Sequence, residues 1–227
     1  MSLGEAPFRI IAVSAGTSDP STTRMLVDRA AQASIERLRE SGRNTTVRVI
    51  ELAPIAAEIA QSLVGGVPTA AVQQAIEEVA AADALIVSTP VYKAGISGLF
   101  KSFADILDND LLIAKPVLLT ATAGAARHAM VVDDHLRPLF AFLRAMPAPT
   151  SVFAAPEDWG SAELGKRVDR AAGELVALML SGVGREIAES GWGGYQHTFG
   201  GNATRAERAG SDVDLDTDLM RLARGGR

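Results

Sequence analysis

The sequence has no cysteine, few aromatic residues and no long hydrophobic run. The absence of cysteine excludes disulfides, cysteine nucleophiles and cysteine-bound iron–sulfur clusters, and it fits a reducing compartment. No apolar stretch approaches the ~18 residues that a membrane-spanning helix needs. The amino terminus also lacks the basic and apolar regions of a secretory signal. We therefore expect a cytoplasmic protein.

Clusters of basic residues are also missing. The formal net charge is −5, and 22% of the residues are charged. Because nucleic acids and anionic membranes are bound by clustered Lys and Arg, we expect neither as a partner. The histidines lack the H-x-x-x-H and H-E-x-x-H spacings of zinc sites, so we expect no metal. The absence of a G-x-S-x-G elbow argues against a Ser-His-Asp hydrolase.

Five apolar stretches alternate with segments of helical spacing. Continuous apolar runs favour strands buried on both faces, and the alternation predicts an α/β fold in which helices cover both faces of a parallel sheet. We expect the strands at residues 8–13, 45–52, 84–87, 117–120 and 151–154.

The helices are predicted from apolar periodicity and from proline positions. Pro68 starts a helix, and a further one begins beyond Gly98. Residues 53–66 predict an irregular connection with a short helical piece. Residues 129–146 predict a helix that breaks near Leu136 or Arg137, because Pro138 lies inside it. A final helix is expected over about residues 163–189.

The loop after the first strand, residues 14–23, is dense in hydroxyl groups and precedes a helix. Free N–H groups, the positive end of the helix dipole and several hydroxyl donors would converge there, which suits a phosphate monoester. A simple helix N-cap is the alternative, although it needs only one hydroxyl. The loop matches neither the dinucleotide fingerprint nor the ATP-binding P-loop.

A second loop follows the third strand. Pro90 cannot donate a ladder hydrogen bond and biases Thr89 towards extended geometry, so the strand is predicted to stop at Thr89. Gly95 and Gly98 would let the backbone approach a flat or charged group. A third loop, residues 121–128, is rich in small residues that would let a ring system lie against the backbone.

The run Thr89-Pro90-Val91-Tyr92-Lys93, followed by Ser97-Gly98 and Leu99-Phe100-Lys101, resembles the flavin loop of the NAD(P)H-dependent FMN reductases. That family has a flavodoxin-like fold, which implies a three-layer sandwich around a five-stranded parallel sheet of order 2-1-3-4-5. The resemblance covers roughly residues 8–190. It is closest to the reductases that supply reduced flavin to two-component, flavin-dependent monooxygenases.

The resemblance implies FMN and either NADPH or NADH as cofactors, and no catalytic side chain, because the flavin carries the chemistry. It places the FMN phosphate in the first loop and the flavin ring between the other two. The cofactor-binding residues that it implies are Ser14, Thr17, Ser21, Thr22, Thr23, Thr89, Pro90, Val91, Tyr92, Lys93, Ala94, Gly95, Thr122 and Gly124.

Several side chains in these loops allow two interpretations. Lys93 either assists the backbone N–H groups at the pyrimidine edge of the flavin or is a solvated surface lysine. Tyr92 either stacks on the flavin or lies at the rim with its hydroxyl in water. Arg127 and His128 either meet the 2′-phosphate of NADPH or begin a solvated helix.

The leading function is therefore an NAD(P)H:FMN oxidoreductase that supplies a monooxygenase. An FMN-containing quinone or azo-compound reductase and a non-enzymatic, flavodoxin-type electron carrier are the alternatives. The family implies a homodimer or homotetramer. Residues 1–190 would form the FMN-binding domain. Residues 191–227, with Trp192, Tyr195 and Phe199, would form a glycine-rich aromatic arm and a charged tail, partly disordered or packed on a neighbouring subunit.

Overall fold

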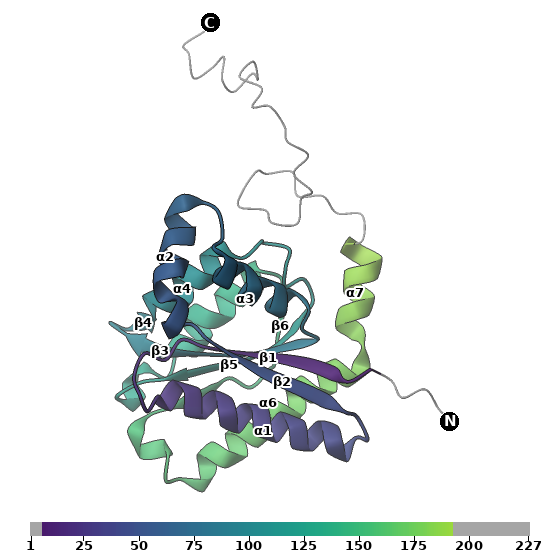
Figure 1. Cartoon of the computed structure of the whole chain (residues 1–227). Coiled ribbons are helices and arrows are strands. Elements are labelled where there is room, and N and C mark those ends of the chain that lie inside the picture. Colours follow the sequence, from purple (N-terminus) through teal and green to yellow (C-terminus); the bar gives the residue numbers. More distant parts are fainter. Residues whose placement is uncertain (1–5, 193–227) are drawn as a thin grey trace, which may run out of the picture.

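A parallel sheet forms the middle layer of the protein (Figure 1). The computed structural model describes residues 6–192. The main strands are β1 (Phe8–Ser14), β2 (Thr45–Glu51), β3 (Ala84–Tyr92), β5 (Pro116–Thr122) and β7 (Val152–Ala154). They lie in the order β2-β1-β3-β5-β7, and all these pairs are parallel. The predicted flavodoxin-like order is confirmed.

The sheet has seven strands rather than the five predicted. The two additional strands are β4 (Gly95–Ile96), which is antiparallel to the end of β3, and β6 (Met146–Pro147), which pairs with the start of β5. Each has two residues, which is too short for any alternation of apolar and polar side chains to reveal it.

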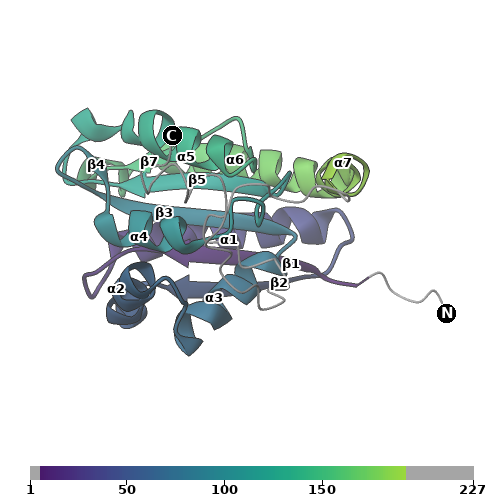
Figure 2. The ribbon, with the colours of Figure 1, turned by 90° about the horizontal axis from the view of Figure 1, so that it is seen from above.

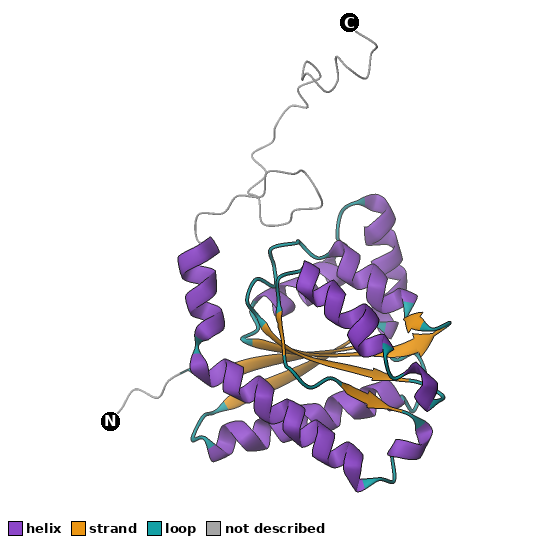
Figure 3. Cartoon of the chain, turned by 180° about the vertical axis from the view of Figure 1, so that it is seen from behind, coloured by secondary structure: helices purple, strands orange, loops and turns teal. Residues whose placement is uncertain are grey.

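Alternate strand residues face two separate cores, because successive side chains in a strand point to opposite faces. Ile10 and Ile86 face a core formed with α1 (Thr22–Glu40) and α6 (Ala162–Ser181). Residues such as Ile11 and Leu85 face the other core. That core is covered by α2 (Ala56–Gly65), α3 (Ala70–Ala80), α4 (Gly98–Ile106) and α5 (Arg137–Phe142) (Figures 2 and 3).

The structure corrects two of the predicted helical segments and confirms a third. Residues 53–66 are more regular than expected, with the 3-10 turn η1 (Ala53–Ile55) leading into α2. The predicted break at Arg137 is confirmed, since a π-helical turn, η3 (Val132–Leu136), ends where α5 begins. The final helix does not continue to 189, because Gly182 adopts a left-handed conformation and separates α6 from α7 (Val183–Trp192).

The helix α7 packs against the amino end of the sheet. A Cβ at Gly184 would lie 2.3 Å from the carbonyl oxygen of Ala114, so only glycine allows this approach. Within residues 6–192, no single helix is long and apolar enough to cross a membrane. The helical segments Ala53–Gly65 and Ala70–Ala80 reach the necessary length and hydropathy only when taken together, and the chain bends by 91° between them. Of the arm predicted over residues 191–227, residues 191–192 form the end of α7 instead, and residues 193–227 lie outside the described part of the chain.

Candidate functional site

A cleft of about 380 Å³ lies at the carboxyl edge of the sheet, which is within the usual size range of small-molecule sites. It is bounded by the three loops singled out in the sequence and by a fourth loop after β7. The residues that line it are Thr17, Ser18, Thr22, Thr23, Pro90, Val91, Tyr92, Thr122, Ala123, Gly124, Pro156 and Trp159.

The loop after β1 is folded tightly at the start of α1. The hydroxyl of Ser21 accepts a hydrogen bond from the N–H of Arg24 at 3.2 Å and so caps the helix. A Cβ at Gly16 would lie only 1.9 Å from Ser21 Oγ. Any larger residue at position 16 would displace the side chain of Ser21 from its capping position. Sequence reasoning missed Gly16, although it is the only glycine among residues 14–23.

The predicted phosphate-binding hydroxyls divide into two groups. Thr17 and Thr22 are exposed and line the cleft, together with Ser18, which was not predicted. Ser14 is buried and does not line it. Thr23 is 2% exposed, and its hydroxyl lies 2.7 Å from that of Thr122 on the loop after β5. The hydrogen bond between these two hydroxyls ties the first and third loops together.

The strand β3 continues through Pro90 to Tyr92 instead of stopping at Thr89. The carbonyl oxygen of Ser88 accepts a hydrogen bond from Ala15 on the β1 side. In a strand, residues two positions apart direct their backbone groups towards the same neighbouring strand. An N–H at position 90 would therefore point towards β1, as the carbonyl of Ser88 does, but β1 ends before it reaches that level. The proline therefore removes no ladder hydrogen bond, and the prediction of a stop was wrong.

A tight hairpin joins β3 to β4. Lys93 and Ala94, rather than the glycines, have positive φ angles of 50° and 61°. Positive φ at both central residues is the type I′ turn, which fits the twist of paired strands. Neither Gly95 nor Gly98 has a positive φ, and the close approach of a flat or charged group to their backbone stays a prediction. Lys93 and Ala94 are exposed and lie outside the lining of the cleft.

Buried hydroxyls fasten the base of the hairpin to α4. Thr89 Oγ1 accepts a hydrogen bond from the Ser97 N–H at 3.0 Å, and it lies 3.2 Å from Ser97 Oγ. Ser97 in turn caps α4 by accepting from the N–H of Phe100 at 3.1 Å. Thr89 is fully buried and does not line the cleft. Its position indicates a role in holding the hairpin, while Pro90, Val91 and Tyr92 line the cleft.

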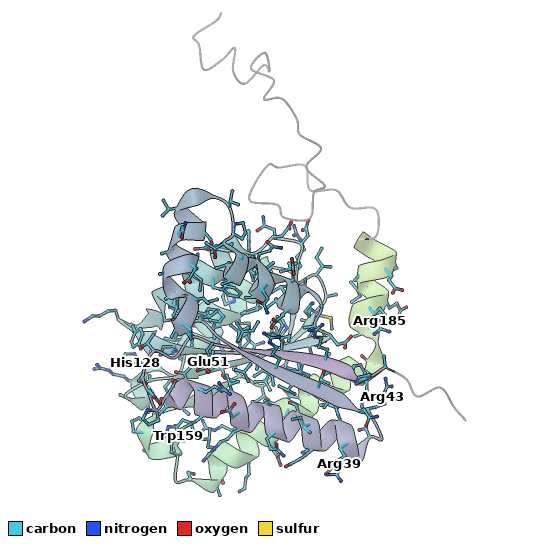
Figure 4. The ribbon with its side chains drawn as sticks, viewed as in Figure 1. Arg39, Arg43, Glu51, His128, Trp159 and Arg185 are labelled. Carbon is cyan, nitrogen blue, oxygen red and sulfur yellow. The ribbon has the colours of Figure 1, made fainter. Side chains whose placement is uncertain are left out.

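The fourth wall of the cleft was missed entirely in the sequence. Pro156 and Trp159 belong to the turn η4 (Pro156–Asp158) and the residue after it, directly beyond β7. A tryptophan just after the fifth predicted strand was the available signal, because parallel strands bring their carboxyl ends to one edge. Figure 4 shows Trp159 near the cleft end of α1 and His128 on the same side of the molecule.

Two arginines near the cleft, Arg24 and Arg127, already have partners. Arg24 contacts Asp28 at 2.9 Å and Glu51 at 2.6 Å. The hydrogen bond to Asp28 is the main reason that the pKa of Arg24 is raised. On the other side, Arg127 donates to Nε2 of His128 at 3.3 Å. Neither residue is part of the lining, so their proposed contact with a 2′-phosphate stays a prediction.

The lining has two chemically different ends. The hydroxyls of Thr17, Ser18 and Thr22 surround the start of α1, where free N–H groups favour an anion. Elsewhere in the lining, Val91, Ala123 and Gly124 offer small and apolar surface, and a Cβ at Gly124 would meet nothing within 4 Å. A phosphate joined to a flat ring system, as in FMN, fits this arrangement.

Comparison with known proteins identifies the family of this chain. A family model described as NADPH-dependent FMN reductase matches residues 8–160. The FMN reductase (NADPH) of Pseudomonas aeruginosa is 40% identical over 182 residues, covering 78% of this chain and 95% of that protein. The NADH-dependent FMN reductase SfnE of Pseudomonas putida is 38% identical over 177 residues, covering 76% and 92%.

Solved structures lead to the same family. An oxidoreductase from Corynebacterium diphtheriae has a TM-score of 0.76 at 40% identity, covering 78% of this chain and 99% of that one. The apo form of the NADH:FMN oxidoreductase EmoB has a TM-score of 0.65 at 27% identity, covering 77% and 89%. An archaeal flavodoxin, 11% identical with a TM-score of 0.53, shares the fold alone. The chain belongs to the NADPH-dependent FMN reductase family.

Proposed function

We propose that this protein reduces FMN in the cleft with NADPH or NADH and releases the reduced flavin to a flavin-dependent monooxygenase. The observation that carries the proposal is the convergence of a hydroxyl-rich helix start and a small-residue surface in one cleft. When bound, FMN would supply the ring that accepts the nicotinamide hydride. The enzyme class is an oxidoreductase that oxidises NADH or NADPH with a flavin as acceptor.

The residues of the cleft would act by binding and orientation. The N–H groups at the start of α1 and the hydroxyls of Thr17, Ser18, Ser21 and Thr22 would hold the phosphate. Ser21 can donate its hydroxyl hydrogen to a phosphate while its oxygen accepts from Arg24. Thr23 would contribute indirectly by fixing the helix start to Thr122.

The ring would lie between the hairpin after β3 and the loop after β5. Val91, Tyr92 and Ala123 would exclude water from its faces, and the N–H groups of the hairpin would stabilise the negative charge that forms on reduction. Tyr92 is 51% exposed, and Lys93 and Ala94 are exposed as well. Such an open edge supports exchange of the flavin with solvent rather than permanent retention.

A homodimer or homotetramer is part of the proposal. Met130 and Phe142, at either end of the η3–α5 segment, are 61% and 67% exposed. Large exposed apolar side chains of this kind often mark contact surfaces. Light scattering after size exclusion would test the assembly, and Phe142→Glu should shift it towards the monomer.

An anaerobic titration tests the function. The purified protein is titrated with FMN and then with NADPH or NADH, while the visible flavin absorbance is followed. Saturable binding and bleaching by the nicotinamide would support the proposal, and absence of FMN binding would overturn it. Protein that stays yellow and passes electrons to a quinone or azo compound by ping-pong kinetics would favour the alternative reductase. Lys93→Ala in the same assay decides between its electrostatic role and simple solvation.

A further inference from the structure

The cleft contains no charged side chain in its described lining, although the group it would bind carries negative charge. Arg24, in the first turn of α1, is the nearest cation in the sequence. Its guanidinium is already shared between Asp28 and Glu51, whose carboxylates offset its charge. A phosphate monoester bound here would therefore depend on hydroxyls and backbone alone, unless another cation lies beside the cleft.

The turn that carries Trp159 is firmly held. Asp158 accepts a hydrogen bond from the N–H of Ala155 at 2.8 Å and another from Arg167 of α6 at 2.6 Å. The carboxylate thus fastens η4 both to the end of β7 and to the neighbouring helix. The indole of Trp159, which is only partly exposed, is consequently a fixed wall of the cleft.

Arg29 supplies the missing cation. Its Cζ lies 5.0 Å from the centre of the Trp159 ring, a distance typical of a cation–π contact. Within residues 6–192 its guanidinium makes no hydrogen bond and no ion pair, so its charge is not offset by a carboxylate. Side chains of a helix tilt towards its N-terminus, which brings this guanidinium back towards the cleft end of α1.

We propose that Arg29, held on the indole of Trp159, recognises the phosphate monoester of FMN and makes the cleft select FMN over riboflavin. The inference rests on the proposed function, because it assigns the phosphate to this end of the flavin cleft. The indole positions the cation at the rim, and the five N–H donors of the guanidinium remain free for phosphate oxygens.

The test compares FMN and riboflavin, which differ by the phosphate alone. Kd values for both are measured by flavin fluorescence with the wild type, Arg29→Met and Arg29→Lys. We expect Arg29→Met to weaken FMN binding roughly three- to tenfold, with riboflavin binding unchanged. Arg29→Lys should recover part of the loss because it keeps the charge. Added salt should weaken FMN binding more in the wild type than in Arg29→Met.

Arg39→Met is the matched control, since Arg39 is an exposed arginine at the opposite end of α1 (Figure 4). It should change neither Kd. Trp159→Leu should lower the preference for FMN, because it removes the ring that holds Arg29. Equal effects of Arg29→Met on both flavins, or none on either, would overturn the inference and leave the proposed function intact. So would an effect seen only as a higher KM for NADPH and not for NADH. A wild type that binds neither flavin would overturn both.

Discussion

The phenol oxygen of Tyr92 lies 3.0 Å from Oγ1 of Thr17, so one hydrogen bond joins the hairpin after β3 to the loop after β1. Both residues line the cleft, and 75 positions separate them in the chain. The contact fixes the phenol ring at the rim although half of the residue is exposed. Tyr92 is thus a wall of the cleft whose orientation depends on the loop that would hold the phosphate.

The first prediction concerns this contact. Tyr92→Phe and Thr17→Val should each weaken FMN binding by about two- to fivefold, because the ring loses its anchor. The double variant should be no weaker than the more affected single variant, since both changes remove the same hydrogen bond. Kd values from flavin fluorescence check this, and fully additive effects would mean that each hydroxyl acts separately on the flavin.

The buried hydroxyl pair leads to a prediction about stability. Thr23→Val should lower the free energy of unfolding by about 1 to 3 kcal/mol, because it leaves the hydroxyl of Thr122 buried without its partner. Adding Thr122→Val should restore much of the loss. Urea denaturation followed by circular dichroism measures both. If Thr23→Val instead abolished FMN binding without loss of stability, Thr23 would be a direct phosphate ligand.

Gly16 and Gly165 offer a matched pair of glycine substitutions. Gly16→Ala should destabilise the protein by about 1 to 3 kcal/mol and weaken FMN binding, because the new Cβ would overlap Ser21 Oγ. Gly165 is exposed within α6, and a Cβ added there would meet nothing within 4 Å. Gly165→Ala should therefore stabilise the protein by about 0.5 to 1 kcal/mol and leave FMN binding unchanged. Thermal unfolding and flavin titration compare the two variants.

The hairpin turn can be relaxed at Ala94. A residue other than glycine with a positive φ of 61° carries a conformational cost, so Ala94→Gly should raise the free energy of unfolding by about 1 kcal/mol. FMN binding should change little if the backbone keeps its course. Chemical denaturation is the measurement. A clear loss of stability would indicate that the turn does not adopt the type I′ geometry.

Stability in acid should depend on Asp133. Burial opposes its ionisation, but hydrogen bonds with Ser151 at 2.6 Å and Arg137 at 2.9 Å outweigh that and lower the pKa of this carboxyl below 3.8. A lowered pKa stabilises the fold above the unfolded-state value, and this contribution is lost as the pH falls through the folded-state pKa. From about pH 6 to about pH 3, the wild type should therefore lose more stability than Asp133→Asn. Parallel curves for the two proteins would contradict this.

Much of the fold follows from local pattern. The apolar runs at β1, β3 and β5 predict strands buried on both faces, and the alternation with helices predicts the parallel sheet. The order of the strands came from the resemblance to a family with a flavodoxin-like fold. The same pattern places three polar loops at one edge, because parallel strands end there together. Short elements such as β4 and β6 cannot be predicted in this way, since two residues are too few to show a periodic pattern of apolar and polar side chains.

What each hydroxyl does was decided only by tertiary structure. Thr17, Thr22 and Thr23 share one stretch of chain and similar chemistry and all line the cleft, yet Thr23 is buried and its hydroxyl contacts that of Thr122, 99 positions away, while the other two are exposed. The importance of Gly16 depends on the position of Ser21, and that of Trp159 on its distance from Arg29. The sequence by itself determined the five main strands and the edge at which the cleft lies, and through the family resemblance it also indicated the order of the strands. Which residues line the cleft was decided by packing between distant segments, because the direction of a side chain in a loop depends on contacts that the local sequence does not show.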